Sequence, residues 1–96
     1  MIYIFVRGLR YRSSEQQIRI LRDLNLGGCI RWYPGEAMVV TKLESYAILQ
    51  ISVGALLNLG LIKQVTHKGR KTKEYKRTDE YCKVIETKKV TRVLEI

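Results

Sequence analysis

The stretch that decides the fold is SYAILQISVGALLNLGLIKQVTHKGRKTKEYKRT, residues 45–78. Its first half places apolar residues at helical spacing, so that one face of a helix would carry Leu49, Val53, Leu56 and Leu57. Gly60 ends this run, because a helix C-terminus often requires a residue that tolerates a left-handed conformation. We predict a helix that ends before Gly60. It is capped by Ser45, or begins at Lys42 if residues 41–44 form a capping box.

The second half of the stretch predicts a strongly basic β-hairpin. Residues 61–65 have β character, a turn follows around Gly69, and residues 73–78 can return antiparallel. Glu74 is the one acid between residues 63 and 77. The cations there are Lys63, Lys68, Arg70, Lys71, Lys73, Lys76 and Arg77. A basic surface that only aids solubility would spread its charge, so this concentration favours nucleic acid as the partner.

Bulk composition supports the same class of partner. The chain has 96 residues, enough for one domain, and is 46% hydrophobic and 28% charged, as globular proteins are. Its net charge of +9 favours DNA, RNA or an acidic membrane face. The apolar run at residues 2–6 is too short for a signal sequence or a membrane span. We therefore expect a cytoplasmic protein with no membrane partner.

Few residues suggest chemistry. Cys29 and Cys82 lie far apart without a CxxC partner, which predicts buried thiols, with one disulfide as the alternative. His67 is the single histidine, so zinc is not expected. The sequence contains no recognisable combination of a nucleophile with a general base, and no Gly-rich phosphate loop is present. The sequence predicts no enzymatic activity, no metal and no cofactor.

The rest of the chain alternates strand and helix signals. Residues 2–6 predict a strand, Ser13-Ser14 caps a helix that ends at Gly27-Gly28, and Cys29–Tyr33 predicts another strand. Pro34-Gly35 is a turn pair, and residues 36–41 fit either a strand or a short helix. A helical piece is expected after Asp79. Residues 90–96 predict a strand that closes a terminal sheet with 2–6 or pairs with a second copy in a homodimer.

The order of these features resembles the winged helix-turn-helix DNA-binding family. The resemblance covers residues 13–86 and is carried by Ser45, by apolar residues at 49, 53 and 56, by Gly60-Leu61-Ile62 and by Thr78. It implies an α+β fold in one domain, residues 1–96. The winged core would be 13–86, the basic hairpin would be the wing, and strands 2–6 and 90–96 would be additions.

The resemblance implies a small transcriptional regulator that places a recognition helix and a wing on duplex DNA. An RNA-binding or ribosome-associated winged helix is the alternative, as is a protein-interaction domain that uses Ile48 and Ile51. Gln50 is the best base reader, because Gln can pair bidentately with adenine, although it would also suit a solvated face. The full set of expected nucleic-acid contacts is Tyr46, Gln50, Ser52, Lys63, Lys68, Arg70, Lys71, Lys73, Lys76, Arg77, Arg10 and Arg12.

Overall fold

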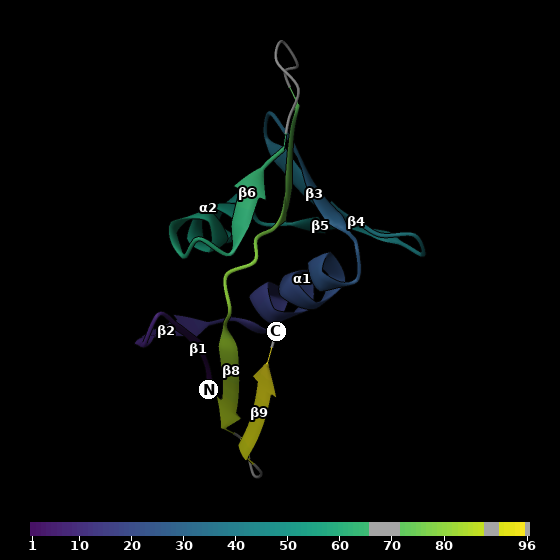
Figure 1. Ribbon diagram of the computed structural model, residues 1–96. Helices are drawn as coiled ribbons and strands as arrows, with labels where there is room; N and C mark the ends of the chain where they lie inside the picture. The colour runs from purple at the N-terminus through teal and green to yellow at the C-terminus, as the bar shows by residue number, and fades with distance from the viewer. Residues whose placement is uncertain (66–71, 88–90, 96) are drawn as a thin grey trace.

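The computed structural model describes residues 1–65, 72–87 and 91–95, which form two helices and nine strands (Figure 1). In chain order these elements are β1 (Ile2–Val6), β2 (Leu9–Ser13), α1 (Glu15–Asn25), β3 (Cys29–Tyr33), β4 (Glu36–Val40), β5 (Ser45–Ile48), α2 (Gln50–Asn58), β6 (Ile62–Gln64), β7 (Lys73–Arg77), β8 (Lys83–Thr87) and β9 (Thr91–Glu95).

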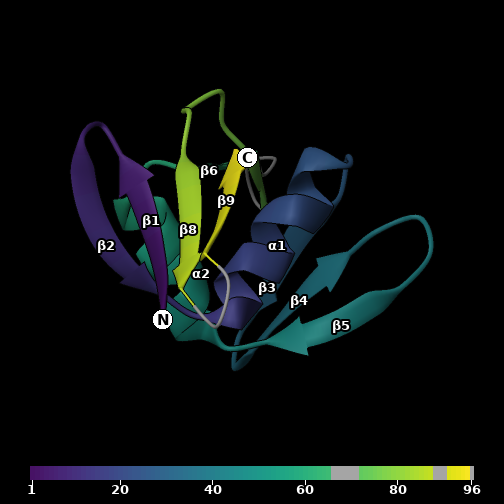
Figure 2. The ribbon, with the colours of Figure 1, turned by 90° about the horizontal axis from the view of Figure 1, so that it is seen from below.

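The described strands form two antiparallel sheets with α1 between them (Figure 1). One sheet has the order β5-β4-β3-β7-β6. The other, which we call the terminal sheet, has the order β2-β1-β8-β9. Seen from below, the strands of the terminal sheet lie in front of α2 (Figure 2). This arrangement confirms the predicted α+β class and the terminal sheet, in which β8 lies between β1 and β9.

A single core joins the two sheets and both helices. Ile4 of β1, Leu21 of α1, Ile30 of β3 and Leu56 of α2 are all fully buried within it. In β1 the buried residues are the first, third and fifth, because successive side chains of a strand point to opposite faces. The inner face of the terminal sheet therefore seals the core, and its other face is turned outward.

Local signals placed α1 correctly. The Ser14 hydroxyl accepts a hydrogen bond from the Gln17 amide at 3.3 Å, and the Gln17 side chain accepts one from the Ser14 amide at 3.3 Å. At the other end Gly27 has a φ of 96°, and the Gly28 amide donates to the Asp23 carbonyl at 3.0 Å. These are a capping box and a Schellman closure, as the sequence predicts.

The predicted helix start near residue 45 is wrong. Residues 45–48 form β5, which pairs with β4 so that Ser45 lies opposite Val40. The Thr41 hydroxyl accepts from the Glu44 amide at 3.1 Å, and the Thr41 amide donates to the Glu44 carbonyl at 2.9 Å. The pattern at 41–44 thus closes the β4–β5 turn and caps no helix. Residues 36–41, which fit either a strand or a short helix, contain strand β4.

The helix itself, α2, begins at Gln50 and ends as predicted. Gly60 has a φ of 74°, and the Leu61 amide donates to the Leu56 carbonyl at 3.1 Å. Val53 and Leu56 are buried, as expected. Leu49 and Leu57 are instead 64% and 37% exposed, so the predicted apolar face is only half correct.

The hairpin is present but is not a separate wing. β6 pairs with β7, with Lys63 opposite Lys76, and β7 also pairs with β3, so the hairpin is the edge of the five-stranded sheet. The predicted turn residues His67, Lys68, Gly69, Arg70 and Lys71 lie outside the described residues.

Strands occupy two segments in which the winged-helix resemblance implies helices. The helical piece expected after Asp79 is wrong, because residues 83–87 form β8 and Val84 packs into the core opposite Ile4 of β1. The winged architecture is not confirmed, since residues 36–48 form a strand pair where the resemblance implies a short helix and the start of the next. No helix of the described residues is both long and apolar enough to cross a membrane.

Candidate nucleic-acid interface

Tyr46, expected to contact nucleic acid, instead anchors β5 to α1. Its hydroxyl donates to the Asp23 carboxylate at 2.5 Å, and the Arg19 guanidinium lies 3.9 Å from the centre of its ring. Arg19 also pairs with Glu44 at 2.9 Å. Burial and the hydrogen bond to Asp23 raise the pKa of Tyr46 above its ordinary value. The half-buried side chain is therefore held against α1.

The two polar candidates of α2 are also used internally. The Gln50 amide nitrogen donates to the Tyr33 carbonyl at 3.1 Å, which ties the start of the helix to the β3–β4 turn. Ser52 is 5% exposed and donates to the Gln16 side chain at 3.0 Å. The exposed side of α2 carries apolar Ile51 instead, which is 78% exposed. This geometry does not favour the predicted base reading by Gln50.

Arg77 is likewise a structural residue. Its half-buried guanidinium donates to the carbonyls of Leu61 at 3.1 Å, Thr78 at 3.0 Å and Glu80 at 2.7 Å. It also contacts the Cys82 sulfur at 3.6 Å. These bonds join the chain that leaves α2 to the chain that enters β8. This geometry does not favour the predicted phosphate contact by Arg77.

Two exposed cations of the described part of the hairpin, Lys63 and Lys76, lie on one face of its sheet. Ile30 and Tyr75 point into the core, so the residues beside them in β3 and β7 point to the opposite side. We call this side the basic sheet face. It contains Arg31, Lys63, Glu74 and Lys76. The expected contact Lys73 lies on the core side of β7, where its ammonium is 5.1 Å from the Trp32 ring centre.

Charge on the basic sheet face is unbalanced. Arg31 lies opposite the acid Glu74, but Lys63 lies directly opposite Lys76, and both lysines are exposed. Neither lysine takes part in the ion pairs Arg7–Glu80 and Arg19–Glu44, which join described residues. Like charges directly across a strand pair destabilise a sheet. Arg31 was not among the contacts expected from the sequence, although the alternation of side chains along the strand predicted at residues 29–33 could have indicated it.

The buried Cys29 lies on the same side of β3 as Arg31, two residues before it. Burial, and after it Glu74, raises the pKa of the Cys29 thiol, while Arg31 and Lys76 act in the opposite direction. Burial also raises the pKa of Cys82, which Arg77 opposes. Both cysteines are buried thiols without a disulfide, which confirms that prediction.

Arg10 and Arg12, both expected to contact nucleic acid, are exposed on β2 in the terminal sheet. Their strand belongs to the terminal sheet, whereas the β6–β7 hairpin is the edge of the five-stranded sheet (Figure 1). The structure therefore does not bring the predicted contacts into one surface.

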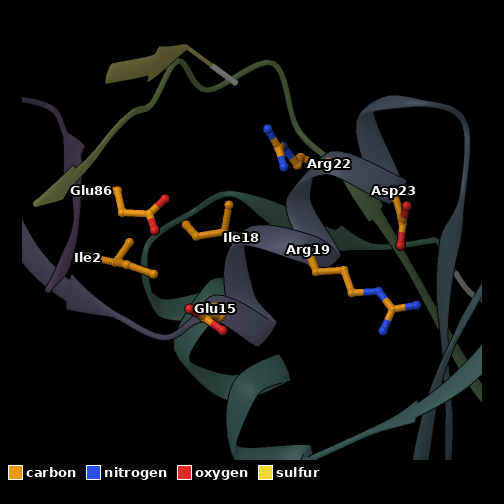
Figure 3. Close-up of a pocket in the computed structure, with 7 residues that line it drawn as sticks. All are labelled: Ile2, Glu15, Ile18, Arg19, Arg22, Asp23 and Glu86. Atoms are coloured by element: carbon orange, nitrogen blue, oxygen red, sulfur yellow. The ribbon is translucent and has the colours of Figure 1, made fainter. Parts of the chain in front are cut away.

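A pocket of about 380 Å³ lies between α1 and the terminal sheet (Figure 3). Its lining residues are Ile2, Glu15, Ile18, Arg19, Arg22, Asp23 and Glu86. Arg19 and Asp23 point away from Ile2 and Glu86, toward the contacts with Tyr46 that are given above (Figure 3). The charged groups do not converge on one point, so the pocket offers no arrangement for acid–base catalysis.

Across the part of the chain that the structure describes, no three His, Cys, Asp or Glu residues are grouped as a metal site would need. Comparisons of the chain with protein-family models, curated proteins and solved structures found no match.

Proposed function

We propose that this protein binds nucleic acid through the basic sheet face, with duplex DNA as the favoured target and gene regulation as its role. The observation that carries the proposal is the exposed Lys63–Lys76 pair. Two like charges held opposite one another cost stability unless an anion lies between them. Phosphates of a nucleic-acid backbone supply such an anion, and their binding releases condensed counterions.

The proposed mode of binding is contact with the backbone rather than reading of bases. Lys63, Lys76 and Arg31 are cations, which bind phosphate oxygens irrespective of sequence. Gln50 and Ser52, the α2 residues expected to contact DNA, form hydrogen bonds inside the protein. We therefore expect affinity to depend strongly on salt and weakly on DNA sequence.

The order of helix α2, Gly60 and hairpin β6–β7 supports a relation to winged domains in which the hairpin contributes most of the binding. Structured RNA is the alternative ligand for the same face. A homodimer through the terminal segments also remains a proposal, with β9 as the available edge strand. We propose a cytoplasmic location, where the buried thiols would stay reduced.

A second candidate function, protein interaction, draws on α2. Of the two residues expected to form this interface, Ile51 is 78% exposed but Ile48 is buried, and the exposed N-cap residue Leu49 lies beside Ile51 in its place. Exposed apolar residues grouped on a surface mark many protein interfaces. On this reading Ile51→Ser would abolish partner binding without changing affinity for nucleic acid.

A salt titration tests the main proposal. Fluorescence anisotropy would measure the dissociation constant for duplex DNA and for a structured RNA over a range of salt concentrations. Three phosphate contacts predict a slope of log K against log salt of about −3, or steeper if further cations take part. Tighter binding to RNA would replace DNA as the ligand, and salt-independent binding to either would overturn the proposal.

A further inference from the structure

The outer face of the terminal sheet carries aromatic and basic residues in ordered rows. Its side chains alternate with those that seal the core, so they point away from α1 and α2. Register across the four strands defines the rows. One row is Arg12, Tyr3, Ile85 and Val93, and the next is Arg10, Phe5, Lys83 and Glu95.

Two aromatic rings occupy the middle of this face. Tyr3 and Phe5 are two residues apart on β1, so both side chains leave the same face from positions about 7 Å apart along the strand. Both are only half-buried. Figure 2 views the molecule from the side of this sheet, with its strands in front of α2. Val93, in the same row as Tyr3, is 51% exposed.

Cations flank the rings. Arg10 and Arg12 are exposed on β2, and the Arg10 guanidinium lies 4.9 Å from the centre of the Tyr3 ring. Lys83 lies on the other side, directly opposite Phe5. The acid in these rows is Glu95, and its carboxylate accepts a hydrogen bond from the Tyr81 hydroxyl, which raises the pKa of Tyr81. The net charge of the face is therefore positive.

We propose that this outer face binds single-stranded nucleic acid, with bases stacked on Tyr3 and Phe5 and phosphates held by Arg10, Arg12 and Lys83. Stacking on aromatic side chains needs unpaired bases, because the bases of a duplex are already stacked on one another. A second copy of the chain is a poorer occupant, because a two-fold interface would bring this positive face against itself. The inference concerns a different surface from the basic sheet face and does not rest on duplex binding.

The test removes the rings and keeps the strand. In the Tyr3→Ile/Phe5→Ile variant, β-branched apolar residues preserve the sheet but offer no flat surface for stacking. Stacking on two rings predicts a loss of affinity for a short oligothymidylate of about 30-fold or more, while affinity for duplex DNA changes less than about 3-fold. The Tyr3→Phe/Phe5→Tyr variant keeps both rings and should bind as the wild type does.

A cross-linking measurement and a second variant extend this test. Ultraviolet cross-linking of the wild type to the oligothymidylate should attach it to the peptide that contains Tyr3 and Phe5. If the isoleucine variant does not fold, Arg10→Glu/Arg12→Glu changes exposed residues only and should weaken binding about 100-fold.

Unchanged oligothymidylate affinity in a folded variant would overturn the proposal. The proposal also fails if Lys63→Glu/Lys76→Glu abolishes that affinity while the isoleucine variant retains it. Sedimentation that shows a dimer, which the isoleucine variant dissociates, would assign the face to contact between copies.

Discussion

Arg77→Ala should lower the free energy of unfolding by about 2–4 kcal/mol, because the guanidinium holds together three segments of chain. It donates to the carbonyls of Leu61, Thr78 and Glu80, and these acceptors would lose a charged partner. A hydrogen bond to a charged group contributes about 1.5–3 kcal/mol, and partial exposure of Arg77 reduces the sum of the three. Chemical denaturation followed by circular dichroism would measure the change.

Lys76→Ala is the matched control, since it removes the neighbouring cation of β7 from an exposed position. Its effect on the free energy of unfolding should stay within about 0.5 kcal/mol. If Arg77→Ala proved as stable as Lys76→Ala but bound DNA more weakly than Lys76→Ala does, Arg77 would be a binding residue after all.

Lys63→Glu/Lys76→Glu should weaken binding to duplex DNA by about 100-fold at low salt and reduce the slope of the salt dependence by about 2. Each substitution removes one phosphate contact and adds a repulsive charge to the basic sheet face. Anisotropy titrations of the variant and the wild type at matched salt concentrations would measure both quantities.

The control for this variant must change net charge equally at another place. Arg22→Glu/Lys42→Glu does so at two exposed positions of α1 and the β4–β5 turn. General electrostatic attraction alone would give the two double variants the same loss of affinity for duplex DNA. The local account predicts a much smaller loss for the control. It also predicts that Lys63→Glu alone stabilises the uncomplexed protein by about 0.5 kcal/mol, because it creates an opposite-charge pair with Lys76.

Local sequence signals located the elements whose ends are determined locally. Ser14 with Gln17 begins α1, and Gly60 ends α2, because these interactions involve residues within one turn of the helix. The turn at Pro34-Gly35 and the pairing of residues 62–64 with 73–77 were predicted for the same reason, since hairpins join near neighbours.

Local signals were misleading where a pattern has two uses. A Thr followed three residues later by Glu can cap a helix or close a turn, and at Thr41 it closes the β4–β5 turn. Residues 45–48 form strand β5 because the edge of β4 is available to pair with them. Residues 83–87 became β8 for a similar reason, as β1 lies beside them. Pairing partners distant in sequence decide such segments, and periodicity does not identify them.

The candidate site was predicted only in part. Lys63 and Lys76 were expected from charge alone and are exposed on one face. Tyr46, Gln50 and Ser52 had suitable chemistry for reading DNA, but each bonds to a partner more than ten residues away in the chain. Such tertiary hydrogen bonds leave no local trace in a sequence.

Binding at the basic sheet face is tested most directly by mapping the nucleic-acid contacts by NMR, following backbone amides during titration with duplex DNA. Binding at the basic sheet face predicts the largest shifts at Arg31, Lys63 and Lys76 and little change along α2. Shifts concentrated on α2, between Gln50 and Asn58, would contradict it and restore the helix as the reader of DNA.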